Sequence, residues 1–207
     1  MDALATHGQT AGPVLVPEDA ARADLYDLLA TLLRAAPDAA MLRALGGLSG
    51  DATPIGRAVD ALARVAGSTG EMAAEREYHD LFIGVGRGEL VPFGSYYLTG
   101  FLNEKPLGLL RRELARLGIE RDEGVREPED HVAALMEVMA GLVRGTLGAG
   151  DPADAARMFA AHVEPWAGHF FGDLEAARRS ALYAPVGTLG KALMAVEAEA
   201  FAMEGRT

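Results

Sequence analysis

Residues 126–131, with the sequence REPEDH, bring three carboxylates and an imidazole into six positions. Carboxyl and imidazole groups at this spacing could act as general acid and base, or could bind a cation. Part of this acidity also has an ordinary helical explanation. Pro128 suits the first position of a helix, which would place Glu127 at the cap and Glu129 and Asp130 in the first turn, where carboxylates face the helix dipole favourably.

His131 borders the apolar stripe that follows, so it could be a packed histidine bonded to a nearby backbone group. A metal site would need further ligands, and the other four histidines offer no pair at the i, i+4 spacing of a helical zinc motif. The chain has no cysteine, which excludes thiolate metal sites, disulfides and cysteine nucleophiles. We therefore expect neither a metal nor another cofactor.

A second set of candidate residues is aromatic and apolar. The segment EREYHDLF places three of them at helical steps of three and four, and a glycine-rich loop over residues 82–100 adds the others. These candidates are Tyr78, Leu81, Phe82, Pro92, Phe93, Tyr96 and Tyr97. Such a set could simply pack in the core, but tyrosine-rich loops beside apolar grooves are typical of peptide or protein recognition.

The elements that must position these residues are helices. Leucine and alanine recur at steps of three and four almost throughout, and alternating β-branched patterns are missing, so the sequence predicts an all-α fold. The expected helices span about 18–35, 38–46, 54–66, 70–82, 104–117, 128–147, 152–163, 165–182 and 186–204.

We expect one helical-bundle-like domain over residues 18–207, preceded by a flexible tail at 1–17 that carries two glycines and two prolines without a period. The segment 118–127 is a candidate hinge between two lobes, and it would suit domain exchange in a homodimer.

Charge and hydropathy narrow the possible partners. The net charge of −11 disfavours binding to nucleic acid and to anionic membranes, so a charged partner should be basic. No segment approaches the roughly 18 apolar residues of a membrane span, and the N-terminus lacks the pattern of a secretory signal. The expected location is the cytoplasm.

Two motifs in order carry a family resemblance. The segments EYHDLFIG and VPFGSYYLTG, followed by REPEDHVAALMEVMAGL, resemble the TorD/DmsD family of redox-enzyme maturation chaperones, to which nitrate reductase assembly chaperones are related. The likeness runs from about residue 18 to the last helix and includes HVEPWAGHF. Several relatives have tryptophan where this chain has Tyr78, Phe93 or Tyr97.

The resemblance implies a non-enzymatic, all-helical chaperone that binds the apo form of a molybdenum-cofactor oxidoreductase. It would recognise the twin-arginine signal peptide of that enzyme and delay export until the cofactor is inserted. The seven aromatic and apolar candidates above, with Ser95, Glu127, Asp130 and His131, are the residues it nominates for peptide binding. On this hypothesis Glu127 and Asp130 engage the arginines, His131 orients a carboxylate or contacts the peptide, and the aromatic residues take the apolar segment.

Three other functions stay open. A small helical hydrolase could use Glu127, Asp130 and His131 as acid, base and orienter. The chain could be an assembly chaperone for a nitrate-reductase-type enzyme that is not exported. A scaffold that only dimerises through its helices would show neither turnover nor peptide affinity.

Overall fold

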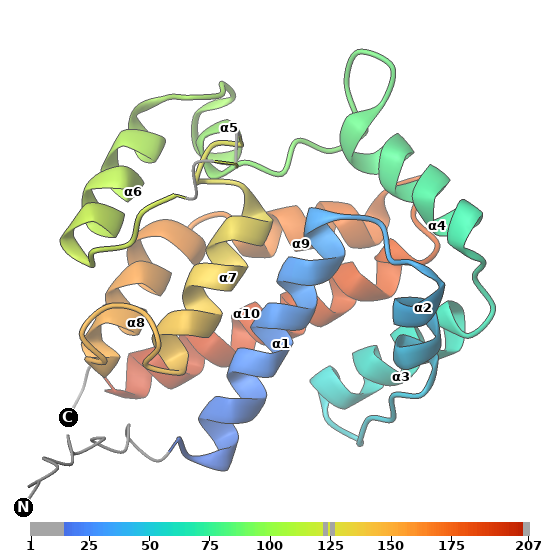
Figure 1. Ribbon diagram of the computed structural model, residues 1–207, viewed down its shortest axis with the longest axis horizontal. Helices are drawn as coiled ribbons and strands as arrows, with labels where there is room; N and C mark the ends of the chain where they lie inside the picture. Colours follow the sequence, from blue (N-terminus) through green and yellow to red (C-terminus); the bar gives the residue numbers. More distant parts are fainter. Residues whose placement is uncertain (1–14, 122–123, 125–126, 205–207) are drawn as a thin grey trace, which may run out of the picture.

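The computed structural model describes residues 15–121, 124 and 127–204, and this part of the chain is built from helices (Figure 1). The all-α prediction is confirmed. The helices are α1 (Pro17–Arg34), α2 (Ala39–Gly46), α3 (Pro54–Ala66), α4 (Glu71–Tyr78), α5 (Gly94–Thr99), α6 (Lys105–Arg116), α7 (Val132–Val143), α8 (Pro152–Met158), α9 (Ala167–Ala176) and α10 (Tyr183–Glu204). A π-helical turn extends α4 over His79–Ile83, and another extends α8 over Phe159–Val163.

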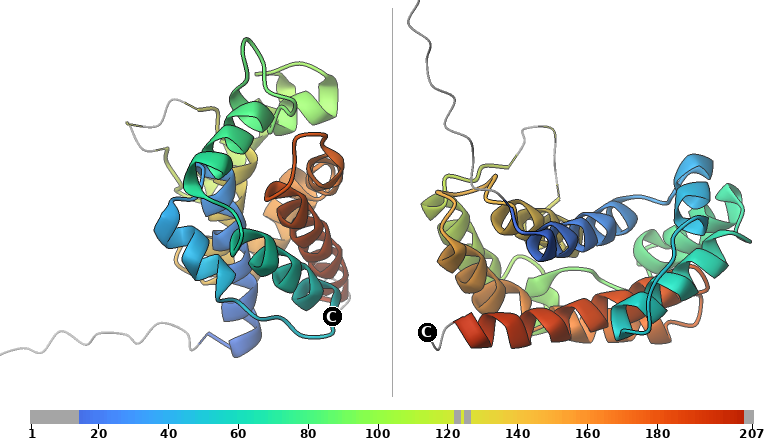
Figure 2. Two further views of the ribbon diagram at one scale, coloured as in Figure 1. Left: turned by 90° about the vertical axis from the view of Figure 1, so that its right-hand side faces the viewer. Right: turned by 90° about the horizontal axis from the view of Figure 1, so that it is seen from below.

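Two pairs of long helices form the body of the molecule. Helix α1 packs along α7, and α9 packs along α10 in a second layer (Figure 2). Helices α2 and α3 pack on each other, and α3 also lies against α10. No helix in the described part of the chain is both long enough and apolar enough to cross a membrane.

Helix α7 is central because its sequence is apolar on nearly every side. Its buried residues include Val132, Leu135, Met136 and Met139, each at most 1% exposed. A helix that is hydrophobic all round must be enclosed by neighbours rather than lie on the surface. Helix α7 is therefore a rigid support for the residues at its N-terminus.

The layer of α9 and α10 is packed closely through glycine. A Cβ atom added at Gly190 would lie 2.1 Å from Cδ1 of Phe171, and one added at Gly187 would lie 2.4 Å from the backbone nitrogen of Glu175. These distances are far shorter than any real contact. The two glycines let α10 approach α9 more closely than any larger residue would allow.

The predicted helices match nine of the ten α-helices in the described residues, and the tenth, α5, lies inside the segment expected to be a loop. The predicted start of α7 at Pro128 is wrong, because the helix begins at Val132 with His131 as its N-cap. Glu127 is thus not the cap, and Glu129 and Asp130 lie before the first turn.

The reason for this late start is a contact between distant segments. Residues 92–94 pair with residues 130–132: the amide of Gly94 donates to the carbonyl of Asp130 at 2.9 Å, and the amide of Val132 donates to the carbonyl of Pro92 at 2.9 Å. Phe93 and His131 form an isolated antiparallel bridge at the centre of this pairing. Backbone groups that would have formed the first helical turn are used across the bridge instead.

The proposed N-terminal tail falls mostly outside the described residues, and Pro17 already belongs to α1. Within the candidate hinge at 118–127, positions 122, 123, 125 and 126 also lie outside them. The division into lobes, the hinge and the homodimer remain predictions.

Candidate functional site: an acidic and aromatic groove

Two adjoining cavities lie where α1, α4, α6 and α7 meet. The first, called the aromatic cavity, has a volume of about 520 Å³ and is lined by Arg34, Ala35, Ala36, Glu75, Tyr78, His79, Phe82, Ile83, Pro92, Phe93, Glu127 and His131. The second, called the acidic cavity, has a volume of about 280 Å³ and is lined by Arg34, Leu114, Ile119, Glu120, Arg121, Glu127, Pro128, Glu129, His131, Ala134, Glu137, Val138 and Leu147. Arg34, Glu127 and His131 line both, so we treat the two cavities as one groove.

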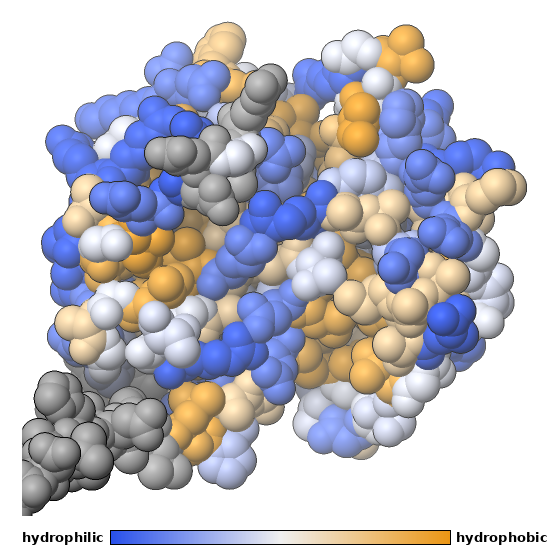
Figure 3. All heavy atoms as spheres, viewed as in Figure 1, coloured by the Kyte–Doolittle hydropathy of each residue, from blue (hydrophilic) through white to orange (hydrophobic). Residues whose placement is uncertain are grey.

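The groove opens on the face shown in Figure 1. In the space-filling view, an apolar floor is visible between α6 and α7 and is bordered by hydrophilic atoms (Figure 3). Leu114, Ile119, Ala134 and Val138 contribute to that floor. A groove of this composition suits a ligand that is partly apolar and partly cationic.

The aromatic cavity is held by ring contacts and one hydrogen bond. The ring of Phe82 lies 5.0 Å from that of Tyr78 and 5.4 Å from that of Tyr183. The hydroxyl of Tyr78 donates to the backbone carbonyl of Arg34 at 2.7 Å, which ties the end of α1 to α4. Burial and the nearby carboxylate of Glu127 together raise the pKa of Tyr78, so its hydroxyl remains a donor.

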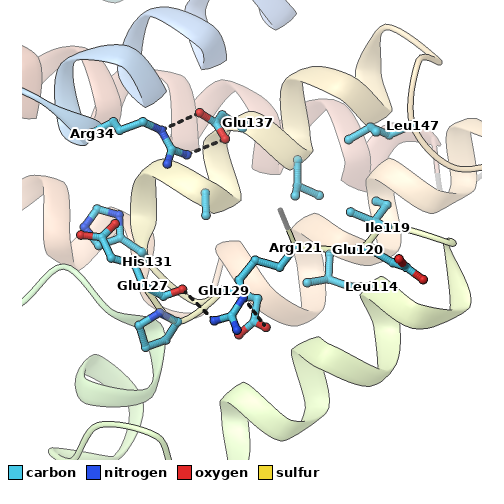
Figure 4. Close-up of a pocket in the computed structure, with 13 residues that line it drawn as sticks. Arg34, Leu114, Ile119, Glu120, Arg121, Glu127, Glu129, His131, Glu137 and Leu147 are labelled. Atoms are coloured by element: carbon cyan, nitrogen blue, oxygen red, sulfur yellow. Dashed lines mark hydrogen bonds and ion pairs between the residues drawn. The ribbon is translucent and has the colours of Figure 1, made fainter. Parts of the chain in front are cut away.

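The carboxylates of the acidic cavity differ in their partners (Figure 4). Glu137 pairs with Arg34, and Glu129 accepts from Nε of Arg111 at 2.9 Å while lying 3.9 Å from Nε of Arg121. The Glu127 side chain, by contrast, has no hydrogen-bond or ion-pair partner among the described residues. Glu127 is therefore a carboxylate at the junction of the two cavities that is available to a ligand.

His131 links the groove to the N-terminus of α7. Its Nδ1 accepts a hydrogen bond from the amide of Ala133 at 3.2 Å, so the neutral ring carries its proton on Nε2. Burial, with a smaller contribution from the positive charge of Arg34, lowers the pKa of His131 from 6.5 to about 4. His131 is thus neutral near pH 7, and Nε2–H has no acceptor among the described residues.

Asp130 has a different position from the one expected. It is 3% exposed, it lines neither cavity of the groove, and its Oδ2 accepts from the amide of Ser95 at 2.7 Å. Ser95 is the second residue of α5, so this carboxylate faces a helix N-terminus. Asp130 therefore holds α5 against the segment that precedes α7.

The nominated residues other than Asp130 divide into three groups. Tyr78, Phe82, Pro92, Phe93, Glu127 and His131 come together in the groove. Leu81 and Ser95 are fully buried behind it. Tyr96 and Tyr97 line neither cavity: the hydroxyl of Tyr96 accepts from Arg87 at 2.6 Å, and that of Tyr97 donates to Asp173 at 2.9 Å.

The arrangement lacks the hydrogen bonds of a hydrolytic triad. The carboxylate of Asp130 bonds to Ser95, and Nδ1 of His131 bonds to a backbone amide, so neither group orients the other. Among the described residues there is also no group of three or more histidine, aspartate or glutamate side chains that could hold a metal ion.

Arg34, Glu75 and Glu137 are among the groove residues that the sequence analysis did not nominate. Arg34 and Glu75 lie on amphipathic helices, where charged residues are usually only solvated. Glu137 did carry a signal, because it is the single charged residue in the apolar run from Val132 to Val143. A lone acid in such a run is costly to enclose and so must lie beside a cavity or a partner.

The described residues thus form an all-α protein whose groove is lined by carboxylates and aromatic rings. The sequence model of the family described as nitrate reductase delta subunit matches residues 49–172, which include most of the groove. The chain belongs to this family, and its resemblance to the TorD/DmsD chaperones is thereby confirmed.

Curated relatives with the name chaperone protein TorD match shorter stretches. The protein of Vibrio cholerae is 36% identical over 73 residues, which cover 35% of this chain and 32% of that protein. The protein of Vibrio parahaemolyticus is 27% identical over 88 residues, or 41% of each chain. The protein of Aliivibrio fischeri is 28% identical over 75 residues, or 35% of each chain. Each match thus spans less than half of the relative.

Proposed function

We propose that this protein is a cytoplasmic, non-enzymatic chaperone for a molybdenum-cofactor oxidoreductase, and that its groove binds the twin-arginine signal peptide of that enzyme. Holding the peptide would delay export while the apoenzyme receives its cofactor. Family membership and the chaperone names of the relatives support the general role. The composition of the groove supports the choice of ligand.

The observation that carries the proposal is the position of Glu127. Glu127 lines both the acidic cavity and the aromatic cavity, and its carboxylate lacks a partner among the described residues. A twin-arginine signal has a basic region followed by an apolar region, and arginine prefers a carboxylate that it can contact at two points. We propose that Glu127 binds one arginine while Tyr78, Phe82 and Phe93 receive the apolar segment.

His131 and Asp130 have separate roles in this proposal. His131 lines both cavities, and we propose that its Nε2–H group donates to a backbone carbonyl of an extended peptide. Asp130 acts as a positioning residue, since it fixes α5 and the segment that carries Glu127. Leu81 and Ser95 support the groove from behind, and Tyr96 and Tyr97 extend the contact surface beyond it.

Calorimetric titration tests this proposal. The probe is a synthetic peptide with two adjacent arginines followed by an apolar segment, compared with its Lys-Lys version. We expect a Kd of about 1 µM or tighter, which corresponds to about −8 kcal/mol, and weaker binding of the Lys-Lys peptide. Glu127→Gln should weaken binding about tenfold because one charge-assisted contact is lost.

Matched variants distinguish binding in the groove from a general effect of charge. Glu164→Gln removes the same charge from an exposed position outside the groove and should leave the affinity unchanged. Asp130→Asn keeps the size of the side chain and should preserve most binding, whereas Asp130→Ala should lose it. Equal losses in Glu127→Gln and Glu164→Gln would contradict binding in the groove, and no binding by the wild type would refute signal-peptide recognition.

A second candidate follows from the description of the matched family. The chain could assemble a nitrate-reductase-type enzyme that is not exported. The same groove would then bind an N-terminal segment of that enzyme without requiring paired arginines. Equal affinity for the twin-arginine and Lys-Lys peptides would favour this alternative.

A further inference from the structure

The acidic cavity already contains a bound guanidinium, and it belongs to the protein itself. Nε of Arg34 donates to Oε1 of Glu137 at 2.7 Å, and Nη2 of Arg34 lies 2.5 Å from Oε2. Two nitrogens of one guanidinium thus meet both oxygens of one carboxylate. This parallel arrangement is specific to arginine, because the ammonium of lysine is a point charge that cannot reproduce it.

The pair lies inside the groove rather than on a remote surface. Arg34 lines both cavities and Glu137 lines the acidic one, so the pair stands where the two meet (Figure 4). Figure 4 shows the Arg34 side chain reaching from α1 across to Glu137 on α7. Any peptide that extends from one cavity into the other must pass this ion pair.

The pair is also exchangeable. The side chains of Arg34 and Glu137 are 36% and 51% exposed, and ion pairs this accessible to water contribute little to stability. The backbone of Arg34 is fixed separately, because its carbonyl accepts the Tyr78 hydroxyl at 2.7 Å. The Arg34 side chain can therefore leave Glu137 without moving the end of α1.

We propose that Glu137 is an arginine-binding position of the groove, which Arg34 occupies until an arginine of the peptide replaces it. This inference rests on the proposed function and adds a second recognition residue to it. Glu127 would bind one arginine of the pair directly, and Glu137 would take the other by exchange. The displaced Arg34 can turn toward Glu75, which lines the aromatic cavity together with Arg34 and has no partner among the described residues.

Exchange makes Arg34 an internal competitor of the ligand. Because Arg34 occupies Glu137, every cationic ligand binds there with lower affinity. A guanidinium displaces Arg34 more effectively than an ammonium does, because only a guanidinium can contact the carboxylate of Glu137 at two points. The protein would therefore reject basic peptides that lack arginine. Specificity arises here because the position is occupied in advance rather than left open.

A double-mutant cycle with Arg34→Gln, Glu137→Gln and the double variant tests the exchange by calorimetry with the twin-arginine peptide. We expect Arg34→Gln to tighten binding about two- to fivefold and Glu137→Gln to weaken it by a similar factor. In the double variant the gain from Arg34→Gln should disappear, because the carboxylate that the peptide would use is gone.

Arg144→Gln is the matched control. Arg144 also joins α1 to α7, through ion pairs with Asp24 and Asp27, but it lines neither cavity of the groove. Its loss changes the net charge by the same amount and removes the same kind of helix contact. If Arg144→Gln tightens binding as much as Arg34→Gln, or if the gain persists in the double variant, the exchange is refuted.

An NMR measurement on the unmodified protein gives an independent test. The side-chain Nε–H signal of Arg34 should shift when the twin-arginine peptide is added, because Nε loses the carboxylate of Glu137 as its acceptor. An unchanged Arg34 signal in the saturated complex would overturn the inference while leaving signal-peptide binding intact. If the wild type binds no peptide by calorimetry, the proposed function fails and the exchange fails with it.

Discussion

At the scale of single residues, the groove depends on polar side chains whose backbone contacts decide their chemistry. His131 illustrates this, because Nδ1 caps α7 and leaves Nε2–H for the groove. The same ring nitrogen could not accept the amide of Ala133 if it were protonated. The cap and the donor at Nε2 therefore require the neutral imidazole.

This requirement predicts an acid dependence of stability. The pKa of His131 is lowered from 6.5 to about 4 in the folded protein, so between these values the unfolded chain binds more protons than the folded one. The free energy of unfolding should then fall as the pH drops from about 6.5 to about 4, by about 3 kcal/mol at most. Above pH 6.5 this contribution is fully present.

Urea unfolding across this pH range measures the effect. His131→Asn keeps a side-chain acceptor at the N-cap but removes the titration, so its stability should change less over the same interval. The difference between the two proteins isolates the histidine from the acidic groups that titrate nearby. Identical pH profiles would show that His131 does not titrate as its burial requires.

At the scale of elements, one carboxylate joins α4 to α10. Glu77 accepts from the amides of Ala181 and Tyr183 at 2.7 and 2.8 Å, and from that of Leu182 at 3.1 Å. These amides lie at the N-terminus of α10, where free N–H groups and the helix dipole favour a negative charge. Glu77 therefore fixes the helix that carries Tyr78 against the longest helix of the fold.

Replacing Glu77 by alanine should lower the free energy of unfolding by about 2 kcal/mol, because the start of α10 loses its acceptors. Glu75→Ala is the control, since Glu75 is an exposed residue of the same helix without a partner among the described residues, and it should cost less than about 0.5 kcal/mol. Chemical denaturation of both variants gives the comparison. Equal losses would mean that Glu77 contributes only as a helix residue.

Elements were predictable where their causes are local. The leucine and alanine spacing defined nine helices, while α5 was missed because a six-residue helix after a glycine-rich loop has too little periodic pattern. The start of α7 was misplaced because its backbone pairs with residues 92–94, about forty positions earlier, and no local signal reports such pairing.

The same difference between local and long-range causes explains which site residues could be predicted from the sequence. The two motifs nominated Tyr78, Phe82, Phe93, Glu127 and His131 by residue type and order, and the structure brings these residues together in the groove. The position of Arg34 at the groove and its contact with Glu137 depend on how α1 crosses α7, which is tertiary information. Asp130 was recognised as important, but its bond to Ser95 could not be read from residues 35 positions apart.

At the scale of the whole molecule, the two layers depend on the close approach of α9 and α10. Gly190→Ala would place a Cβ atom 2.1 Å from Cδ1 of Phe171, a buried ring that cannot easily move. We expect a loss of about 1–3 kcal/mol in the free energy of unfolding, as for other overpacked cores.

Gly168→Ala provides the opposite expectation. Gly168 lies in α9, and a Cβ atom there would meet nothing within 4 Å. Because alanine favours the helix over glycine, this change should raise stability by about 0.5–1 kcal/mol. Thermal unfolding of the two variants should therefore shift in opposite directions. A shift in the same direction would show that packing between α9 and α10 is not the controlling factor.

The bridge between Phe93 and His131 also has a consequence for the order of events during synthesis. The aromatic half of the groove leaves the ribosome first, while the acidic half follows with α7. Until α7 has emerged, residues 92–94 have no backbone partner and the groove has only one wall. A partly made chain thus cannot assemble the groove, which is complete only after the second segment has docked on the first.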